Sequence, residues 1–555
     1  MRGSPADFPI LGWLRGYPPA WLRLDLIAGL TAAAVVIPKA MACAVIAGLP
    51  IETGLYTALA ALAVYPLFGS SRVLSVTTTS TIALMTAAAV VAVNAGASAA
   101  KPLAVAATLA LLVGVFLILA RILRLGFLAN FISKPVLVGF EAGIGVVIAV
   151  SQLKAVLGVH LVGKTTLAIL LELPGHLAHT HLLTLGVAAA GIALLVLLPR
   201  VLPRVPASLV LVVGSILTAA LFGLGNRGVS LVGAVPAGLP ALALPDFTLI
   251  GRLWPAALGI ALMSFTESVA AARTFIRHDE SVIVPNRELV AVGAANLAAA
   301  FLAGLPAGGG TSQTAVNAKA GARSQMAEFV TALVVVACLL FLSKAIGLLP
   351  QAALGALVFV VAITMVKPEK FRAIGRIRKD ERAWAFVTMA GVILIGTLEG
   401  ILLAVAISVL TIMYQANHPP VYALAYNREK AIFRRAGEHE QDETIPGLLI
   451  LRTEGRLTFA NAANAGDKMK ELVEQVNPTV IVLECSAIPD IEYTALVMLT
   501  EAEEKLRARG VTLWLAALNP DLLKLIQRSP LGERLGRERM FFNLHKVVEA
   551  YRHAG

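Results

Sequence analysis

From about residue 25 to residue 416 the chain is a succession of apolar stretches, each ended by proline, glycine or charged residues. A helix needs about 20 residues to cross the hydrocarbon core of a bilayer, so stretches of this length predict membrane-spanning helices. Roughly 390 residues, at about 28 residues for one span and its loop, allow about 14 spans. We place them near residues 25–48, 52–69, 76–95, 101–122, 132–154, 182–200, 206–224, 253–276, 287–305, 311–325, 327–346, 352–366, 382–398 and 400–416.

The pattern changes after residue 416. An Asn-His-Pro-Pro run breaks the last apolar stretch, and the charged segment 417–444 is typical of a linker. From residue 445 to 555, short β-branched runs alternate with stretches of helical spacing, which predicts one small α/β domain. Its strands are expected at GLLILRTEG, RLTFANA, TVIVLECS and VTLWLAAL. The predicted organisation is therefore an N-terminal segment (1–24), a membrane domain (25–416), a linker (417–444) and the α/β domain (445–555).

Composition and charge agree with a membrane protein. The chain is 58% hydrophobic and 14% charged, whereas soluble domains average roughly 45–50% and 25%. The formal net charge of +12 belongs to the apolar part and not to the α/β domain, so we expect no nucleic-acid partner. With 14 spans, about 21 basic residues fall on one side of the membrane and about 6 on the other. The excess predicts a cell-membrane protein with both termini in the cytoplasm, and the N-terminal residues lack the apolar core of a cleavable signal peptide.

Nothing in the sequence predicts an enzyme, a cofactor or a metal site. No predicted span contains a histidine, and no HExxH motif, CxxC pair or Cys/His cluster occurs. The three cysteines are far apart in the sequence, and buried apolar positions are expected for them.

Two stretches rich in Gly, Ser and Thr lie at matching places in the two halves of the membrane domain, 25–224 and 253–416. They are GSSRVLSVTTTSTIAL (69–84) and GLPAGGGTSQTAVN (304–317), and each leads into a short apolar helix. Paired interrupted segments of this kind indicate a binding site near the membrane midplane. The N-termini of two half-helices, with their free N–H groups and positive dipole ends, attract an anion. The candidate groups are Ser75, Thr77 and Thr78 in the first segment and Gly308, Gly309, Gly310, Thr311 and Ser312 in the second.

Several motifs resemble those of the SulP family (sulfate permease, solute carrier 26). IPKAMACAVIAGLPIETGLYTAL is similar to the signature that usually begins IPQGMAYA, and LTFANA and LECSAIPDIEYTAL resemble the family's C-terminal STAS domain. Further similar stretches are GSSRVLSV, SKPVLVGFEAG, FTESVAAARTF and NRELVAVGAANLAAAFLAGLPAGGGTSQTAVNAKAG. The resemblance covers nearly the whole chain. It implies an α-helical fold of 14 spans in two inverted seven-span repeats, a homodimer, and secondary transport of small anions.

The sequence departs from the family pattern at the centre of the predicted site. Lys39 stands where glutamine is usual, and Gln313 stands where arginine is common. We hypothesise that Lys39 supplies the positive charge that the arginine supplies elsewhere. The alternatives are a lysine paired with Glu267 or one that extends to the membrane surface. Cys43 replaces the usual tyrosine, which puts an aromatic contact at that position in doubt.

Two acidic residues lie inside predicted spans. Glu267 is in the middle of its span, where a carboxylate is unfavourable unless it is protonated, paired or in contact with water. In the family the matching acid is linked to ion coupling, so Glu267 is the candidate proton carrier, with Na⁺ coupling as the alternative. Glu141, in the fifth span, occupies a position that is usually uncharged, and we expect it to be a structural partner between helix groups.

The form GGGTSQTAVN, with glutamine in place of arginine, is most similar to bacterial members that carry dicarboxylates such as fumarate. Sulfate and bicarbonate stay open as substrates. Na⁺-coupled symport, anion exchange and an anion channel stay open as alternatives to proton-coupled symport.

Overall fold

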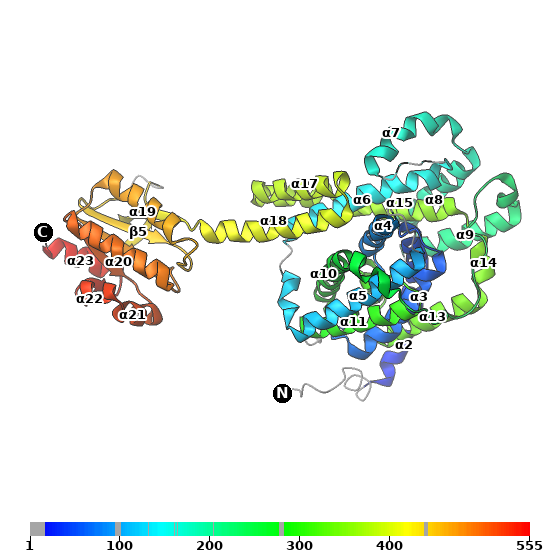
Figure 1. Ribbon diagram of the computed structural model, residues 1–555, viewed down its shortest axis with the longest axis horizontal. Helices are drawn as coiled ribbons and strands as arrows, with labels where there is room; N and C mark the ends of the chain where they lie inside the picture. Colours follow the sequence, from blue (N-terminus) through cyan, green and yellow to red (C-terminus); the bar gives the residue numbers. More distant parts are fainter. Residues whose placement is uncertain are drawn as a thin grey trace. The chain divides into compact units, whose positions relative to one another are not determined.

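The computed structural model describes residues 17–94, 101–130, 133–159, 161, 163, 165–203, 205–276, 282–437 and 442–554 (Figure 1). Most of the predicted N-terminal segment, residues 1–16, lies outside the described residues. The chain divides into two compact units, Met1–Ser408 and Val409–Gly555, and each is described by itself.

Each apolar stretch predicted in the first half contains one helix. These helices are α2 (Pro19–Ile46), α3 (Ile51–Phe68), α4 (Ser80–Asn94), α5 (Pro102–Ile122), α6 (Lys134–Leu157), α8 (Leu182–Val201) and α9 (Ala207–Phe222), with α7 (Thr166–His176) in a connection. Helix α6 illustrates how the sequence sets the ends. Ser133 is the N-cap, and its hydroxyl accepts the Val136 N–H at 3.4 Å, while Gly158 ends the helix in the left-handed region at φ 67°.

The second half repeats this arrangement. Its helices are α10 (Ile250–Thr274), α11 (Pro285–Phe301), α12 (Thr311–Lys319), α13 (Met326–Phe341), α14 (Ser343–Gly347), α15 (Gln351–Met365), α16 (Pro368–Ile377), α17 (Lys379–Leu394) and α18 (Thr397–Asn417). Within the described residues, seven segments are long and apolar enough to cross a membrane, and α4, α9 and α13 are shorter apolar helices. The predicted helical membrane fold is confirmed, and the number of 14 spans stays a prediction.

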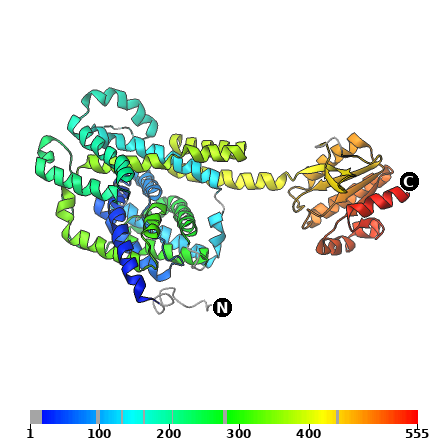
Figure 2. The ribbon, with the colours of Figure 1, turned by 180° about the vertical axis from the view of Figure 1, so that it is seen from behind.

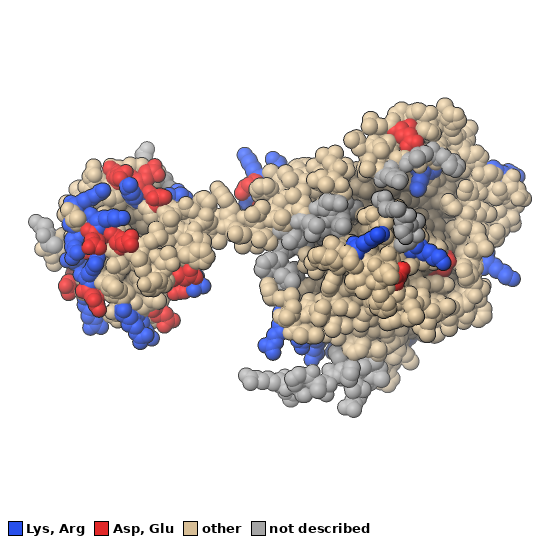
Figure 3. Space-filling model, in the orientation of Figure 1, with Lys and Arg blue, Asp and Glu red and all other residues tan. Residues whose placement is uncertain are grey.

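Burial in the first unit is the reverse of that in a water-soluble protein. Large apolar side chains face outwards, among them Leu182 and Leu221, each 79% exposed, whereas Glu288 (0%) and Glu328 (1%) are buried. In a membrane, outward leucines contact lipid and buried polar groups bond to one another. Figure 3 shows the same contrast, with few charged side chains over this unit and many over the C-terminal unit.

The helices of the first unit form two groups. The core bundle contains α2–α5 and α10–α13, and the flanking bundle contains α6, α8, α9 and α15–α17. In both ribbon views α6 and α15 lie beside one another, apart from the cluster of α5, α10 and α11 (Figures 1 and 2).

The contacts between helices recur in matching pairs. The contact of α5 with α11 matches that of α13 with α3. The contact of α10 with α5 likewise matches that of α2 with α13, and the contact of α6 with α17 matches that of α15 with α8. Matching contacts of this kind are expected when each half of the unit contains the same arrangement of helices.

The C-terminal unit is built on a six-stranded mixed sheet in the order β4-β3-β5-β6-β7-β8. Strand β3 is antiparallel to β4 and β5, and the remaining pairs are parallel. The strands are β3 (Val421–Asn427), β4 (Ile432–Arg435), β5 (Leu448–Thr453), β6 (Val480–Glu484), β7 (Thr512–Ala516) and β8 (Met540–Phe541). The sheet thus begins inside the segment that the sequence analysis assigns to a linker, of which residues 438–441 lie outside the described residues.

Helices cover both faces of this sheet. One face packs against residues of α19–α22, and the other packs against α23. The helices are α19 (Ala462–Val476), α20 (Tyr493–Ala508), α21 (Pro520–Gln527), α22 (Pro530–Leu535) and α23 (Leu544–Ala554). This unit confirms the predicted α/β domain.

One predicted strand of the C-terminal domain is wrong. In the segment RLTFANA only Leu457 forms an isolated bridge, to Ile491, and α19 already begins at Ala462. The Asn461 side chain accepts the Thr458 N–H at 2.8 Å, which closes a turn and leads the backbone away from the sheet. The alternating pattern was that of a strand, but a local side-chain hydrogen bond decided the conformation.

Candidate functional site

Two short strands bring the interrupted segments of the two halves together. Strand β1 (Val76–Thr77) pairs antiparallel with β2 (Gly308–Gly309), so that Val76 lies opposite Gly309. The Gly310 N–H extends the pairing with a 3.1 Å bond to the Ser75 carbonyl oxygen. Helices α4 and α12 follow directly, so the N-termini of the two short helices meet in the core bundle, as the sequence predicts.

The glycines of the second segment let it lie against helix α10. A Cβ atom on Gly309 would be 2.7 Å from the Ser268 Cα atom, and one on Gly308 would be 3.2 Å from the Ser264 Cα atom. The Gly309 N–H donates to Ser268 Oγ at 2.7 Å, and Ser264 Oγ donates to the Ala307 carbonyl oxygen at 2.6 Å. Two serines of α10 therefore hold β2 at a distance that only glycine permits.

The N-terminus of α12 carries no side-chain cap. Its N-cap residue is Gly310, which has no side chain, and within the described residues no side chain bonds to the N–H groups of the first turn. Thr311 and Ser312 in that turn are exposed, while Gln313 is buried. The positive end of the helix and two hydroxyl groups are therefore available to an anion.

The Lys39 ammonium group lies against this first turn. Lys39 Nζ donates to Ser312 Oγ at 2.6 Å and to the Gln313 Oε1 atom. Among the described residues no salt bridge joins Lys39 to Glu267, although the two groups are within electrostatic range. The structure thus places a cation beside position 313, and it shows neither a direct Lys39–Glu267 ion pair nor a lysine extended to the surface.

Glu267, on α10, bonds to the other short helix. The Thr79 hydroxyl donates to Glu267 Oε2 at 2.8 Å. The Thr79 hydroxyl oxygen in turn accepts the Ile82 N–H at 3.3 Å and so caps α4. The half-buried carboxyl group therefore acts directly on the residue that closes the first turn of α4.

Three further predicted residues are Thr77, Cys43 and Thr78. The Thr77 hydroxyl accepts a hydrogen bond from Gln313 Nε2, and Cys43 Sγ lies 3.8 Å from the Thr78 carbonyl oxygen. The Thr78 hydroxyl is buried and has no hydrogen-bond partner among the described residues.

Comparison with known proteins gives the family. The model of the sulfate permease family matches residues 22–391, and the STAS domain model matches residues 440–547. The chain belongs to the sulfate permease family. It is 36% identical over 552 residues to a probable sulfate transporter of Mycobacterium tuberculosis, covering 98% of both chains.

Two solved structures share the fold of this sulfate permease family member. Murine solute carrier 26 family member A9, an anion transporter in the inward-facing state, matches with a TM-score of 0.88 at 21% identity over 100% of this chain and 96% of that one. The transmembrane domain of BicA, a cyanobacterial bicarbonate transporter, matches with a TM-score of 0.59 at 26% identity over 69% of this chain and 97% of that one. The predicted family and fold class are confirmed, while the narrower assignment to fumarate carriers stays a prediction.

The sequence analysis missed Glu328, a buried acidic residue on α13. Its Oε2 atom accepts the Ser75 hydroxyl at 3.0 Å, and its Oε1 atom accepts Asn317 Nδ2 at 2.7 Å. The Ser75 hydroxyl, predicted as a ligand group, is therefore engaged by Glu328. The available signal was an acid in an apolar stretch directly after the second short helix, which is the same signal that identified Glu267 and Glu141.

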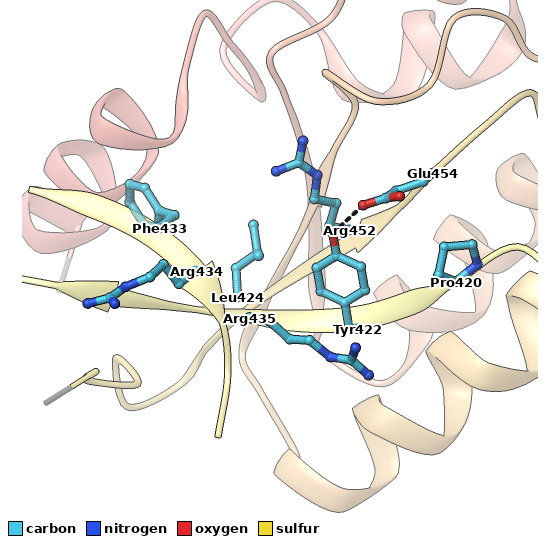
Figure 4. Close-up of a pocket in the computed structure, with 8 residues that line it drawn as sticks. All are labelled: Pro420, Tyr422, Leu424, Phe433, Arg434, Arg435, Arg452 and Glu454. Carbon is cyan, nitrogen blue, oxygen red and sulfur yellow. Dashed lines mark hydrogen bonds between the residues drawn. The ribbon is translucent and has the colours of Figure 1, made fainter. Parts of the chain in front are cut away.

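A separate pocket of about 390 Å³ lies in the STAS domain (Figure 4). Its basic groups already have partners there: Arg434 pairs with Asp442 at 3.1 Å, and Arg452 pairs with Glu484 at 3.2 Å. Arg435 lies over the Tyr422 ring, at 5.2 Å from its centroid. Acids thus pair with two of the three arginines of this pocket, and the third lies over an aromatic ring. It is lined by Pro420, Tyr422, Leu424, Phe433, Arg434, Arg435, Arg452 and Glu454.

Proposed function

We propose that this protein is a secondary active transporter that moves a small anion and a proton together across the cell membrane. The observation that carries the proposal is the pairing of the two short helices, with the Lys39 ammonium group at the uncapped N-terminus of α12 and the Glu267 carboxyl group at the N-terminus of α4. A cation and a helix dipole attract the anion, and a carboxyl group beside them can hold the proton.

Charge explains why the two solutes travel together. An ionised Glu267 repels an anion that enters between the N-termini of α4 and α12, here called the first and second helix tips. A proton on Glu267 removes that repulsion. Anion affinity and proton affinity then rise together, as linkage requires. The core bundle, which contains both tips, moves against the flanking bundle and exposes the site to each side in turn. The proposal includes a homodimer in the cytoplasmic membrane with both termini inside the cell.

The substrate class is a small organic or inorganic anion. Sulfate is the first candidate, because the mycobacterial relative is named as a probable sulfate transporter. A dicarboxylate such as fumarate is the second, because Gln313 leaves Lys39 as the one cation bonded to the first turn of α12 within the described residues. Bicarbonate is the third, since the BicA structure shares the fold.

Purified protein in liposomes tests this function. We expect sulfate or fumarate to accumulate when an inward proton gradient is imposed and not when an inward Na⁺ gradient replaces it. Glu267→Gln should abolish accumulation driven by the proton gradient, because the neutral amide cannot titrate. Glu501→Gln, on the exposed surface of α20, is the control with the same change of charge and should behave as the unmodified protein.

Two results would contradict the proposal. Acceleration by Na⁺ without any response to the pH gradient means that Na⁺ is the coupling ion. Anion currents without proton-driven accumulation mean that the protein is a channel.

A further inference from the structure

A hairpin of two helices in the flanking bundle concentrates positive charge between two apolar segments. Helix α16 follows α15, and α17 follows α16 after the single residue Arg378. Residues 367–382 contain seven basic and three acidic residues, which gives a net charge of +4. Figure 3 shows basic side chains at one end of the α17 ribbon drawn in Figure 1. The apolar residues of α15 and α17 put this charge at one surface of the predicted membrane domain.

Acidic side chains offset only part of this charge. Lys370 Nζ is 4.0 Å from the Glu141 Oε2 atom on α6, and Arg378 Nε is 3.7 Å from Glu381 Oε1. Within the part of the chain that the structure describes, the basic residues of the hairpin that no salt bridge reaches are Lys367, Arg372, Arg376, Lys379 and Arg382. An anion from outside the chain can therefore bind here without displacing an acidic side chain.

The packing of the hairpin brings three arginine side chains together. Arg372 and Arg376 are exposed and lie one turn apart on α16, so they are neighbours on its surface. From α17, the Arg382 side chain lies across Gly375, where a Cβ atom would be 2.6 Å from Arg382 Cδ and 2.8 Å from Arg382 Nη1. Gly375 is three residues after Arg372 and directly before Arg376. Three like charges thus share one small surface, and like charges at this spacing repel unless an anion offsets them.

Large apolar side chains lie beside the arginines in the sequence and are also exposed. Ile377, the last residue of α16, is 85% exposed, and Trp384 on α17 is 41% exposed. The two helices are held together by Phe371 and Phe386, whose ring centroids are 4.8 Å apart. Tryptophan favours the level of the lipid headgroups, and helices with both basic and apolar exposed groups lie in the interface between lipid and water. The apolar neighbours therefore favour a lipid over a free anion or an acidic protein surface.

We propose that the α16–α17 hairpin binds the headgroup of an anionic phospholipid, with Arg372, Arg376 and Arg382 around the phosphate and Ile377 and Trp384 against the lipid chains. A guanidinium group suits this role because its paired N–H donors match phosphate oxygens and its charge does not depend on physiological pH. Clusters of about four to eight basic residues next to a membrane-spanning helix attract anionic lipids in the same way. The inference goes beyond the proposed function and holds for any transported anion and any coupling ion.

The test measures which lipid contacts Trp384 in the reconstituted full-length protein. Liposomes contain phosphatidylglycerol and phosphatidylcholine, and one of the two carries bromine, which quenches tryptophan fluorescence on contact. The difference between the protein and its Trp384→Phe variant gives the quenching at Trp384. We expect phosphatidylglycerol to be enriched there by about tenfold or more over its mole fraction. Arg372→Gln with Arg376→Gln should lower the enrichment at least about fivefold, the preference that one basic residue near the membrane surface contributes.

A matched pair of arginines on the C-terminal unit provides the control. Arg509→Gln with Arg528→Gln makes the same change of charge at exposed positions and should leave the enrichment unaltered. Addition of excess inorganic phosphate distinguishes the two sources of a phosphate group. Enrichment that persists in its presence supports a lipid ligand, whereas loss of the enrichment identifies a free anion as the ligand and contradicts the proposal.

Two further results would overturn the inference. If the unmodified protein shows no enrichment of phosphatidylglycerol at Trp384, the hairpin does not select an anionic lipid. If the Arg372 and Arg376 double variant keeps the full enrichment, these arginines do not hold the headgroup. Should the double variant fail to fold, the unmodified protein at rising salt concentration decides, because screening weakens an exposed electrostatic site. A fall in enrichment then supports the inference, and an unchanged enrichment contradicts it.

Discussion

The two short helices occupy matching places in the two halves of the membrane unit, yet their N-termini are built from different residues. Helix α4 follows a run of threonines, and Thr79 caps it while donating to Glu267. Helix α12 follows three glycines and has no side-chain cap, and the Lys39 ammonium group lies against its first turn. One backbone arrangement thus presents an acid at one tip and a cation at the other, and the proposed coupling of a proton to an anion rests on this difference.

The strand pair between the tips shows how the difference is maintained. Val76 and Gly309 lie opposite one another, but a branched side chain is possible only on β1. On β2, any Cβ atom at position 309 meets α10, because Ser268 Cα would be 2.7 Å away. Gly308 and Gly309 are required because the strand lies close to α10. At the N-cap, a Cβ atom on Gly310 would meet the Gln313 side chain, and the glycine leaves the N-terminus of α12 without a capping side chain.

The most damaging change predicted at this site is Gly309→Ala. The added methyl group meets backbone that cannot rotate away, so β2 must leave α10 and the tips must separate. We expect anion uptake to fall by more than about tenfold and stability to fall by about 1–3 kcal/mol, the usual range for overpacking. Radiolabelled uptake and thermal unfolding of the purified protein measure the two effects.

Gly214→Ala is the matched control for this change. A Cβ atom on Gly214, in α9, has no neighbour within 4 Å, so the same chemical substitution is sterically free. Alanine is also the better helix former, by about 0.5–1 kcal/mol, so stability should be unchanged or slightly higher. Equal effects of the two substitutions would show that close packing against α10 is not what requires glycine at position 309.

Removing the cation from the second tip should have the next largest effect. Lys39→Gln keeps a hydrogen-bonding side chain but removes the positive charge near Ser312 and Gln313. A hydrogen bond to a charged group contributes about 1.5–3 kcal/mol, and each 1.4 kcal/mol is tenfold in affinity. Anion affinity, measured by isothermal titration or by the concentration for half-maximal uptake, should therefore fall by about tenfold or more.

A second substitution distinguishes charge from shape. Gln313→Arg, added to Lys39→Gln, returns a cation to the tip and should restore part of the affinity. Lys154→Gln, which changes an exposed lysine in the last turn of α6, should leave affinity unaltered. Unchanged affinity in Lys39→Gln would remove the lysine from the site.

The sequence predicted the helices, the two segments and their meeting because each depends on local composition or on the repeat. Apolar length predicts helices, and glycine and hydroxyl residues at matching positions predict two interrupted segments. Which side chains face the ligand depends on packing, and there the sequence was less informative. Ser75 was predicted as a ligand group, but its hydroxyl bonds to Glu328 on a helix about 250 residues away in the sequence.

The C-terminal domain repeats this lesson. Parallel strands with continuous β-branched runs, such as β6, were predicted correctly because their pattern is strong. The segment around Thr458 and Asn461 was not, because one amide side chain closes a turn that hydrophobic alternation cannot reveal. The hydrophobic pattern determines secondary structure where many residues share it. Where the pattern covers only a few residues, a single side-chain hydrogen bond can determine the conformation instead.

The smallest predicted effect concerns Glu328, which bonds to Ser75 in the first interrupted segment and to Asn317 in α12. Glu328→Gln keeps an oxygen to accept Asn317 Nδ2 and places an amide against the Ser75 hydroxyl, which can accept as well as donate, so anion affinity and the proton response should change by less than about threefold. Glu328→Ala leaves the buried Ser75 hydroxyl without its acceptor, while Asn317 Nδ2 still donates to the Val73 carbonyl oxygen, so stability should fall by about 1–3 kcal/mol. The two variants, compared by uptake at several pH values and by thermal unfolding, separate a structural carboxyl group from a proton carrier. If Glu328→Gln abolishes proton-driven uptake, Glu328 carries the coupling proton. The contrast between an acidic first tip and a cationic second tip is then wrong.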